Sequence, residues 1–388
     1  MKKFLLLTIT VFVLLSFIHG ESFITQQTFG RLNNVGDIRS ISMGLRGLSL
    51  YDNENSSTIN PATSTYSENI IISLGEIVTN YNISYNKFSE DFYKRNFTTP
   101  YLNIIFPSPV KDLTFSAYFN SEINSNLHLK FENNNEIINE FFEKNLNKIQ
   151  FASAYKIFDN LSLSLGGLYL FGNEENKYLI RNTEYTNNLE EDIWKYKYEG
   201  YGIKFGTLLN LDNFNFSGMY RPSFEVDINR SLDEIAYGKF TFDYPQNISL
   251  GVSYSNNDNL LVSTEYITEN WSNLNYSSYQ NFKMQDMSRY AIGLEYQLEI
   301  KKKQNYIKKK ISIPIRTGFY YQDGYYQNGK EYAFSLGTSI NPFESKHARF
   351  DFTLSIGKRE MRLDTDYEET FINFGISFNG KDKWYNIK

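Results

Sequence analysis

The sequence predicts an all-β chain, a closed antiparallel transmembrane β-barrel of about fourteen strands with an N-terminal plug segment in its lumen. Three observations predict this class. Apolar and polar residues alternate with period two through most of the chain, aromatic residues make up 17% of it, and only the first twenty residues contain a long apolar run. Barrel strands alternate in this way and average out near neutral, which agrees with a mean hydropathy of −0.46.

Residues 1–20 have the three parts of a secretory signal peptide. Lys2 and Lys3 precede an apolar run that ends at Leu15, and cleavage after Gly20 fits a small-residue site. A single N-terminal anchor helix is the alternative for the same run. No other stretch approaches the roughly 20 apolar residues that a spanning helix needs. We therefore expect export from the cytoplasm with cleavage of the signal peptide.

Residues 21–68 do not alternate, and we expect them to form the plug. They include Gly44 and Gly47 and a polar run that starts at Asp52. A fourteen-stranded barrel is wider than the eight-stranded kind that its own side chains fill, so an unplugged lumen would leak. The best candidate for plug gating is the tripeptide Asn60, Pro61 and Ala62, because it would couple the plug to the first strand. An ordinary turn is the other explanation, since Asn and Pro suit turns.

Residues 69–380 are expected to form the barrel. In the clearest strand, Ile372, Phe374, Ile376 and Phe378 share one face, and Asn, Gly and Ser residues occupy the other. The expected strands begin near Ile70, Pro100, Leu113, Leu146, Leu161, Tyr198, Phe214, Gln246, Leu260, Arg289, Ile311, Glu331, Arg349 and Thr370. Because this number is even, the first strand can start and the last strand can finish on the same side of the membrane, which we expect to be the periplasmic side.

The composition of the two strand faces separates this chain from a soluble sandwich, whose outward face is usually charged. Here the polar face consists mainly of Gly, Ser, Ala, Asn and Thr, and the apolar face is rich in aromatic residues. Charges on the lipid face would cost about 2–4 kcal/mol at the membrane midplane. The charged residues expected to face the lumen instead are Lys204, Glu265, Glu295, Arg316 and Asp351.

Connection lengths give an independent test of the barrel. Alternate connections are short, as at 158–160 and 212–213, whereas the others, such as 124–145 and 172–197, are long. Short periplasmic turns and long extracellular loops are typical of outer-membrane barrels. The exception is the lysine-rich connection 301–310, which is long on the short side. Residues 381–388 form a polar tail, either an overhang or a periplasmic contact.

Several segments resemble the outer-membrane long-chain fatty acid transporter (FadL-type) family. Met43-Gly44-Leu45-Arg46-Gly47 followed by Asn60-Pro61-Ala62 is similar to the family's plug. The segments 202–206, 215–222, 244–251 and 289–293 are similar to its later strands. The resemblance covers most of the mature chain.

The resemblance implies a bacterial outer-membrane location and a hydrophobic small-molecule ligand that leaves sideways at a kinked third strand. The implied partners are outer-membrane lipid, that ligand, and the barrel-assembly machinery during insertion. In this chain the expected third strand, 113–123, departs from the family pattern, because it has no glycine at which the lateral exit would form. Relatives with other roles exist in the superfamily, among them a secretion-system shuttle protein.

Residues that carry enzyme chemistry are scarce. The chain has no cysteine and three histidines, and its net charge of −5 argues against nucleic acid as a partner. Gly324 to Glu331 nearly matches a phosphate-binding loop but lacks the required Ser or Thr. We therefore expect no catalytic residues, no metal and no cofactor. Two hypotheses remain: a passive channel for hydrophobic compounds, and a non-transporting barrel that acts as an adaptor or as an assembly or secretion component. A hydrolase is a distant third.

Overall fold

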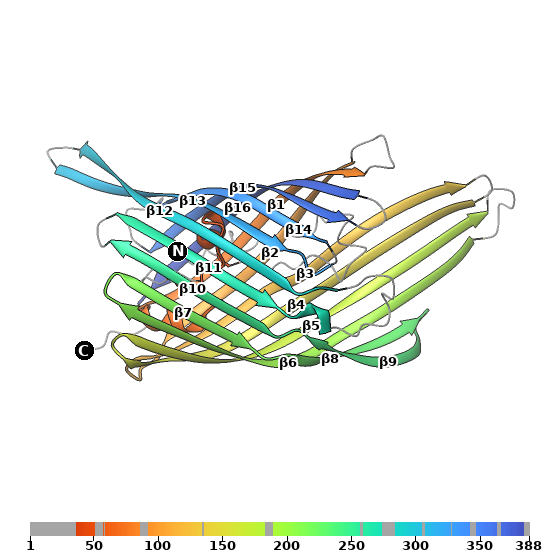
Figure 1. The fold of residues 1–388 in the computed structure, drawn as a ribbon, viewed down its shortest axis with the longest axis horizontal. Coiled ribbons are helices and arrows are strands. Elements are labelled where there is room, and N and C mark those ends of the chain that lie inside the picture. Colours follow the sequence, from red (N-terminus) through yellow and green to blue (C-terminus); the bar gives the residue numbers. More distant parts are fainter. Residues whose placement is uncertain are drawn as a thin grey trace.

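The structure is a computed structural model that describes residues 36–50, 57, 59–85, 92–133, 136–182, 189–256, 259–273, 284–304, 307–326, 328–341, 347–362 and 366–383. Its strand segments form one antiparallel sheet that curls into a barrel (Figure 1). The segments are β1 (Ile70–Tyr85), β2 (Phe92–Pro107), β3 (Leu113–Asn133), β4 (Glu136–Phe158), β5 (Leu161–Asn182), β6 (Leu189–Leu211), β7 (Phe214–Arg221), β8 (Phe224–Leu232), β9 (Ile235–Tyr244), β10 (Asn247–Asn256), β11 (Leu260–Glu269), β12 (Met287–Gln304), β13 (Ile307–Asp323), β14 (Lys330–Ile340), β15 (Ala348–Arg362) and β16 (Asp366–Asp382).

The sixteen segments make fourteen barrel strands, because two strands are each broken once. β6 pairs with β7 along its end and with β8 along its start, so β7 and β8 are two parts of one strand. β10 and β9 pair with β7 and β8 in the same order. The breaks fall at Pro222 and Pro245, which have no backbone N–H to give to the sheet. The predicted fourteen-stranded closed barrel is therefore confirmed.

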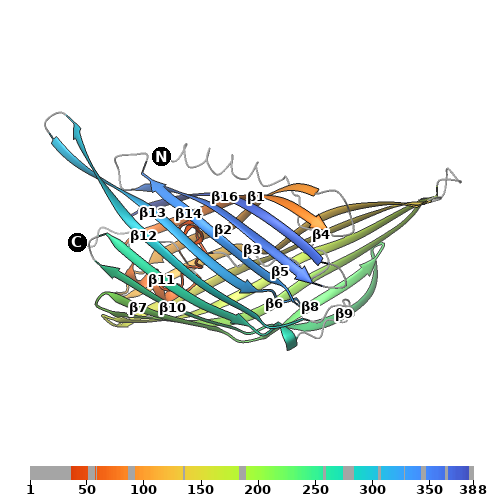
Figure 2. The same ribbon diagram turned by 45° about the horizontal axis from the view of Figure 1, so that its top comes forward.

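The first and last strands close the cylinder. β1 pairs with β16 from Ile70↔Asp382 to Tyr85↔Tyr367, and β5 pairs with β6 on the opposite side. β1 therefore begins, and β16 ends, at the same end of the barrel, which also carries most of the brief turns (Figure 2). We call it the short-turn end and the opposite end the long-strand end.

The side chains of each strand alternate between the two faces of the wall, as the sequence predicts. On β16, Phe374 is 48% exposed, whereas the neighbouring Ser377 and Asn373 are buried inside the barrel. Leu354 and Phe334 repeat this outward exposure on β15 and β14. Large apolar side chains outside and small polar side chains inside are the arrangement expected of a barrel surrounded by lipid. Among the described residues, no helix is long and apolar enough to cross a membrane.

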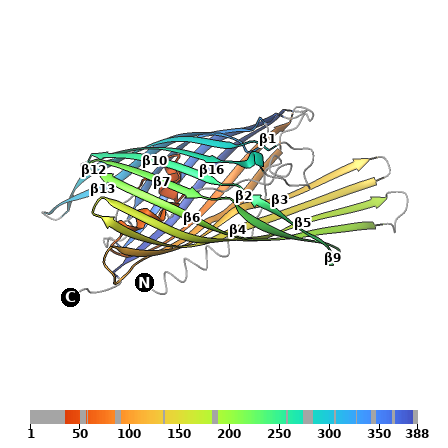
Figure 3. The same ribbon diagram turned by 60° about the horizontal axis from the view of Figure 1, so that its bottom comes forward.

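The connections expected at the long-strand end are largely extended strand. β3 continues to Asn133 and β4 starts at Glu136, and β5 and β6 extend in the same way, so these four strands project well past their neighbours (Figure 3). Their outer parts are rich in Asn, Glu and Lys, which are common in loops, so sequence analysis assigned them to connections. The expected connection 301–310 is also strand, because β12 and β13 pair through it as a hairpin.

The plug segment lies inside the barrel and reaches from one wall to the opposite one. The short helix α3 (Ile38–Ser42) lies against β13 to β16, and the 3-10 helix η1 (Pro61–Tyr66) lies against β3 to β6. Asp37 caps α3 by accepting a hydrogen bond from the Ser40 N–H at 2.9 Å. Both helices are almost wholly buried, so the plug fills the lumen at this level.

Glycines in the wall let the plug backbone lie directly against it. Gly293 on β12 and Gly318 on β13 are paired neighbours. A Cβ atom added to Gly318 would lie 1.8 Å from the Met43 carbonyl oxygen, and one added to Gly293 would lie 2.4 Å from it. Gly44 has a φ of +68°, which glycine adopts readily. The close approach of plug and wall therefore depends on glycine on both sides.

Candidate functional site: the plugged lumen and the β2–β3 seam

Glu265 holds the middle of the plug. This carboxylate on β11 is 4% exposed and accepts hydrogen bonds from the N–H groups of Arg46 (2.7 Å), Gly47 (2.9 Å) and Leu48 (2.7 Å). Successive N–H groups that converge on one anion form a strong backbone binding site. The positive φ of Gly47, +88°, permits the turn that aims them at Glu265.

Asn60 connects two parts of the plug to the wall. Its side-chain oxygen accepts from the Ala62 N–H at 3.1 Å, which caps η1. Its amide group donates to the Leu48 carbonyl at 3.2 Å and to the carbonyl of Thr207 on β6 at 2.9 Å. Pro61 occupies the first helical position, where the absent N–H costs nothing. Asn60 and Ala62 are both completely buried.

A buried charge network holds the other end of the plug. Arg39 of α3 binds both carboxylate oxygens of Glu295, at 2.8 and 2.9 Å. Arg316 contacts the same Glu295 at 2.6 Å and Asp351 at 3.1 Å. Arg349 contacts Asp351 at 3.2 Å. Since a buried charge is tolerated only when it is paired, these contacts tie α3 to β12, β13 and β15 together.

Asp37 sits beside this network at the start of α3. Burial raises the pKa of its carboxyl group, hydrogen bonds from Ser40 oppose that rise, and the nearby Asp351 carboxylate adds to it. The direction follows because removal from water penalises the charged form. The base of the plug therefore combines paired charges with one carboxyl group that burial pushes toward its neutral form.

The five charged residues selected from the sequence all lie buried within the barrel, but in three separate places. Glu295, Arg316 and Asp351 meet in the network under α3, whereas Glu265 stands alone against the plug backbone. Lys204 lies apart and donates to Gln150 at 2.9 Å. The three plug residues Asn60, Pro61 and Ala62 lie together at the start of η1.

Sequence analysis missed a second group of buried polar residues around Glu122 on β3. Glu122 accepts from Lys148 at 2.7 Å and from the Tyr244 hydroxyl at 2.7 Å. Arg39, which reaches from the plug to the wall, was also missed. The only sequence signal for Glu122 and Lys148 is a charge on the polar face of an alternating strand. Arg39 lies in a segment without alternation, so it carried no signal.

An apolar cluster fills the lumen next to the plug, toward the long-strand end. It consists of Leu48, Ile123, Leu146, Leu170, Tyr196, Tyr198, Val226, Ile228, Phe242, Tyr244, Ile267, Trp271, Met287, Tyr325, Tyr326 and Met361. Leu48 comes from the plug, and the other members come from many strands round the wall. Trp271, at the start of the short helix η2 (Trp271–Asn273), packs edge to face against Tyr244 and in a tilted arrangement against Tyr325, with ring centroids 5.6 and 5.0 Å away. Buried ion pairs border this cluster, among them Lys144–Glu174 and Arg221–Glu269, and the Trp271 indole donates to Glu269 at 2.9 Å. The lumen on this side of the plug therefore combines an apolar cluster with paired charges.

The wall has a seam between β2 and β3. Among the described residues, these strands pair only from Tyr101↔Asn120 to Pro107↔Thr114. Beyond this point β2 continues paired with β1 alone, and β3 continues paired with β4 alone. The register shifts between Gly75 and Ile77 on β1 and around Glu122 on β3, beside the place where pairing stops. Bulges of this kind terminate or redirect pairing, so the seam forms without the glycine that the family pattern suggested.

The plug touches the end of the seam. Tyr101 occupies the last paired position of β2, and its hydroxyl accepts a hydrogen bond from the Ile38 N–H of α3 at 3.1 Å. Ile38, Ile77, Tyr101 and Tyr118 form a buried apolar cluster there. A displacement of α3 would therefore act directly on Tyr101, the residue at which the pairing of β2 with β3 stops.

Comparison with known proteins agrees with this geometry. A family model described as BamG matches residues 210–388, slightly under half of the chain. No curated protein matches the sequence.

Solved structures match over nearly the whole chain. A Pseudomonas aeruginosa FadL homologue has a TM-score of 0.64 at 13% identity, with 92% of this chain and 100% of that chain covered. The monoaromatic hydrocarbon channel CymD has a TM-score of 0.59 at 14% identity, with coverage of 91% and 99%. The Ralstonia pickettii toluene transporter TbuX has 0.58 at 15% identity, with coverage of 90% and 98%. The chain therefore has the fold of the FadL-type outer-membrane barrels.

Proposed function

We propose that this chain is a plug-gated outer-membrane channel for the passive uptake of hydrophobic small molecules. The observation that supports it best is the arrangement of an apolar cluster in the lumen, a plug beside it, and a seam in the wall that helix α3 of the plug contacts. Transfer of a hydrophobic solute from water to the apolar cluster lowers its free energy. Lateral exit into the bilayer would then let the solute avoid the aqueous periplasm. In this proposal the short-turn end faces the periplasm.

The proposed gate has two movable contacts. Asn60, Pro61 and Ala62 form one, because Asn60 bonds both the plug and β6. Glu265 forms the other, because it holds three consecutive N–H groups of the plug. Glu295, Arg316 and Asp351 keep α3 in place until the gate moves, and Lys204 supplies a cationic group within the wall. Each of these roles is part of the proposal.

The absence of cysteine from the sequence permits a clean test by disulfide locking. The hydroxyl oxygens of Ser49 on the plug and Ser263 on β11 lie 3.1 Å apart. We expect the S49C/S263C variant, once oxidised in liposomes, to lose uptake of a labelled fatty acid and of labelled toluene, because the plug can no longer move. Reduction should restore uptake, and each single variant should behave like the parent protein. Equal uptake with and without the protein would reject the channel.

A second candidate function is that of an accessory component in outer-membrane protein assembly. The observation that favours it is the BamG family model, which matches residues 210–388. Deleting the gene should then reduce the folded amount of other outer-membrane barrels, and a native pull-down should retain a stable protein partner. Normal barrel levels together with no partner would count against this role, and neither result depends on uptake.

A further inference from the structure

A groove crosses the outer face of the wall on strands β2 to β5, toward the short-turn end. Its volume of about 420 Å³ falls within the range of about 300–1,000 Å³ that small-molecule sites occupy. Large apolar side chains stand at its edges, and they are Phe106, Phe115, Phe151 and Leu165. Small residues form its floor, and they are Ala117, Ser153 and Gly167. The wall is therefore hollowed on the face where large apolar side chains are expected to meet lipid.

The strand register produces this groove, because large and small residues alternate along two neighbouring rows of the sheet. In one row, Ala117 and Gly167 pair with Phe151 from either side. In the next row, the small Ser153 pairs with a large residue on each side. Phe151 is 67% exposed, and a Cβ atom added to Gly167 would have no atom of the described residues within 4 Å. The hollows between the large side chains are therefore open to the outside of the barrel.

The groove covers the depth of one leaflet of a membrane. Ala117, in the row farther from the short-turn end, follows Lys111 of the β2–β3 turn by six residues, which span about 20 Å along a strand. A barrel strand is tilted by about 40°, so this length corresponds to a depth of about 15 Å. The hydrocarbon core of a bilayer is about 30 Å thick, and one leaflet fills half of it. A chain that enters beside the turn would therefore reach the middle of the bilayer along the groove.

The turn below the groove carries an exposed charge of each sign. The Lys111 side chain is 93% exposed, and its Nζ atom lies 4.0 Å from the Oδ2 atom of Asp112. This distance is too long for a hydrogen bond, so each group keeps its capacity to bind a ligand of opposite charge. The Lys156 N–H donates to the Asp112 carbonyl at 3.0 Å, which fixes the turn against β4. Asp159, in the next turn along the rim, is exposed and adds a second negative charge.

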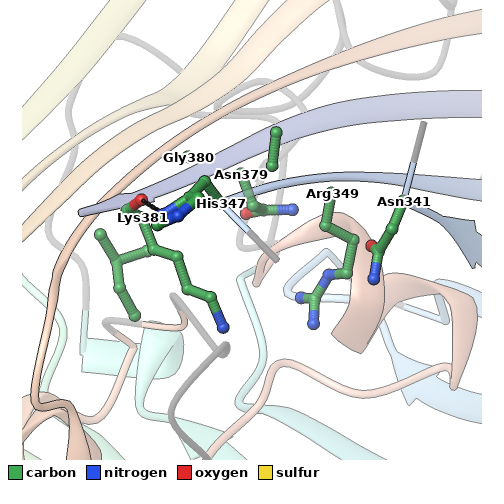
Figure 4. A pocket seen from close by; sticks show the side chains of 8 residues that line it. Asn341, His347, Arg349, Asn379, Gly380 and Lys381 are labelled. Carbon is green, nitrogen blue, oxygen red and sulfur yellow. Dashed lines mark hydrogen bonds between the residues drawn. The ribbon is translucent and has the colours of Figure 1, made fainter. Parts of the chain in front are cut away.

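A second hollow at the same end of the barrel is too small for a ligand chain. It lies beside the β14–β15 turn, and Asn341, His347, Arg349 and Asn379 are among the residues that line it (Figure 4). Its volume of about 10 Å³ is enough for roughly one water molecule. Arg349 is already paired there with Asp351. Of these two hollows, the groove on β2 to β5 is therefore the one that can hold a chain.

We infer that the groove binds an acyl chain of a membrane phospholipid whose head group carries one phosphate and one primary ammonium. The phosphate would pair with Lys111, and the lipid ammonium would donate a charge-assisted hydrogen bond to the Asp112 carboxylate. A free fatty acid fits less well, because it has no cationic group for Asp112 and its carboxylate is repelled by Asp159. A phospholipid therefore matches both the apolar groove and the two charges below it.

The bound lipid lies between the β2–β3 turn and the seam. The groove includes Phe106 and Phe115, which pair with each other, and the pairing of β2 with β3 continues from there to Tyr101↔Asn120, where the seam begins. The lipid therefore covers the paired part of these two strands from outside. The inference rests on the location of the barrel in a membrane and does not depend on transport.

Native mass spectrometry of the full-length protein in detergent measures the binding of phosphatidylethanolamine. The A117L/G167L variant fills the groove and should weaken binding by about tenfold, because roughly two methylene groups of the lipid lose their burial. The control variant T264L/T317L adds the same side chains to the outer face of β11 and β13, where Thr264 pairs with Ile292 and Thr317 with Leu336. It should bind within about twofold of the parent protein, as expected of surface substitutions away from a site.

The head group is tested at the turn. Lys111→Gln should weaken phosphatidylethanolamine binding by about threefold, because one exposed ion pair is lost, and Lys111→Arg should preserve it. Asp112 has a φ of +64°, which Asn also adopts, so Asp112→Asn keeps the turn. This variant should lose the preference for phosphatidylethanolamine over phosphatidylcholine, whose quaternary ammonium has no N–H to donate. Lys239→Gln, which removes an exposed ion pair at the long-strand end, is the control and should bind like the parent protein.

A phosphatidylethanolamine with a photoreactive acyl chain locates the lipid on the protein in nanodiscs. Its crosslinks should concentrate on residues 115–117, 151–153 and 165–167, and they should decrease in the A117L/G167L variant. Equal binding by the A117L/G167L and T264L/T317L variants would overturn the inference, as would crosslinks spread evenly round the barrel.

Two other occupants of the groove are separated by the same measurements. If palmitate competes as strongly as unlabelled phosphatidylethanolamine, the groove binds a solute, and if the A117L/G167L variant abolishes a dimer seen in the mass spectra, it binds a second copy of the chain. Either result would overturn the inference. Lipid binding is measured without transport, so a protein that takes up no fatty acid but binds phosphatidylethanolamine in the groove would reject the channel alone.

Discussion

At the scale of single residues, the plug is held by a few groups whose partners are far away in the sequence. Glu265 and Arg46 are separated by 219 positions, and Arg39 and Glu295 by 256. Alternation predicted Glu265, Glu295, Arg316 and Asp351 on the polar face of their strands, and all four are buried within the barrel. It could not show which of them would meet, because partner choice depends on where the plug lies within the lumen.

The Glu265→Gln substitution tests the contact to the plug backbone. Glutamine keeps the size of the side chain but removes the charge that three N–H groups surround, so we expect a loss of about 2 kcal/mol in the free energy of unfolding. Urea unfolding of the refolded barrel in detergent, followed by the change in gel mobility on heating, measures it. Glu175→Gln is the control, because Glu175 is exposed on β5. Equal stability of the two variants would contradict the assigned role of Glu265.

The Gly318→Ala substitution tests the close approach of plug and wall. The added Cβ would lie 1.8 Å from the Met43 carbonyl oxygen, so the plug must shift. We expect a loss of at least about 2 kcal/mol, as for other overpacked sites, and faster cleavage of the plug by protease. Gly167→Ala on β5 is the matched control, since nothing lies within 4 Å of its added Cβ. If Gly318→Ala leaves plug cleavage unchanged, the plug does not rest on this glycine in solution.

At the scale of elements, the strands were predictable and the seam was not. β16, β15 and β14 alternate cleanly, because one face meets lipid and the other meets the lumen. The seam arises where the register shifts beside Gly75 on β1 and around Glu122 on β3. The bulge on β3 has no glycine that would mark it in the sequence. Sequence analysis assigned the outer parts of β3 to β6 to connections, because these parts are rich in Asn, Glu and Lys, which are common in loops.

The Tyr101→Phe substitution tests the coupling of α3 to the seam. It keeps the ring in its apolar cluster but removes the hydroxyl that accepts from the Ile38 N–H. We expect a loss of about 1 kcal/mol and, if the seam is the exit, faster release of a fluorescent fatty acid into liposomes. Tyr201→Phe is the control, because Tyr201 is 73% exposed on the outer face. If the variant releases the fatty acid at the parental rate, the hydrogen bond between α3 and Tyr101 does not control the seam.

At the scale of the whole molecule, the barrel class and strand number followed from local patterns that repeat along the chain. An N-terminal segment inside the barrel was also predicted, and α3 and η1 are buried there, whereas residues 21–35, 51–56 and 58 of the expected plug lie outside the described residues. Two features needed three-dimensional placement: the apolar cluster, whose members come from strands and connections all round the wall, and the outer groove, whose lining comes from β2 to β5. Both arise from residues that are distant in sequence, so no window of the chain contains their signal.

The contacts of the plug also bear on biogenesis. The plug is made first, yet Glu265, Glu295, Arg316 and Asp351, which hold it, belong to strands β11 to β15, near the end of the chain. An emerging polypeptide thus lacks these anchors until most of its length has been translocated. The plug must therefore be enclosed when β1 finally pairs with β16. An insertion intermediate whose barrel closed earlier would leave the plug outside the lumen.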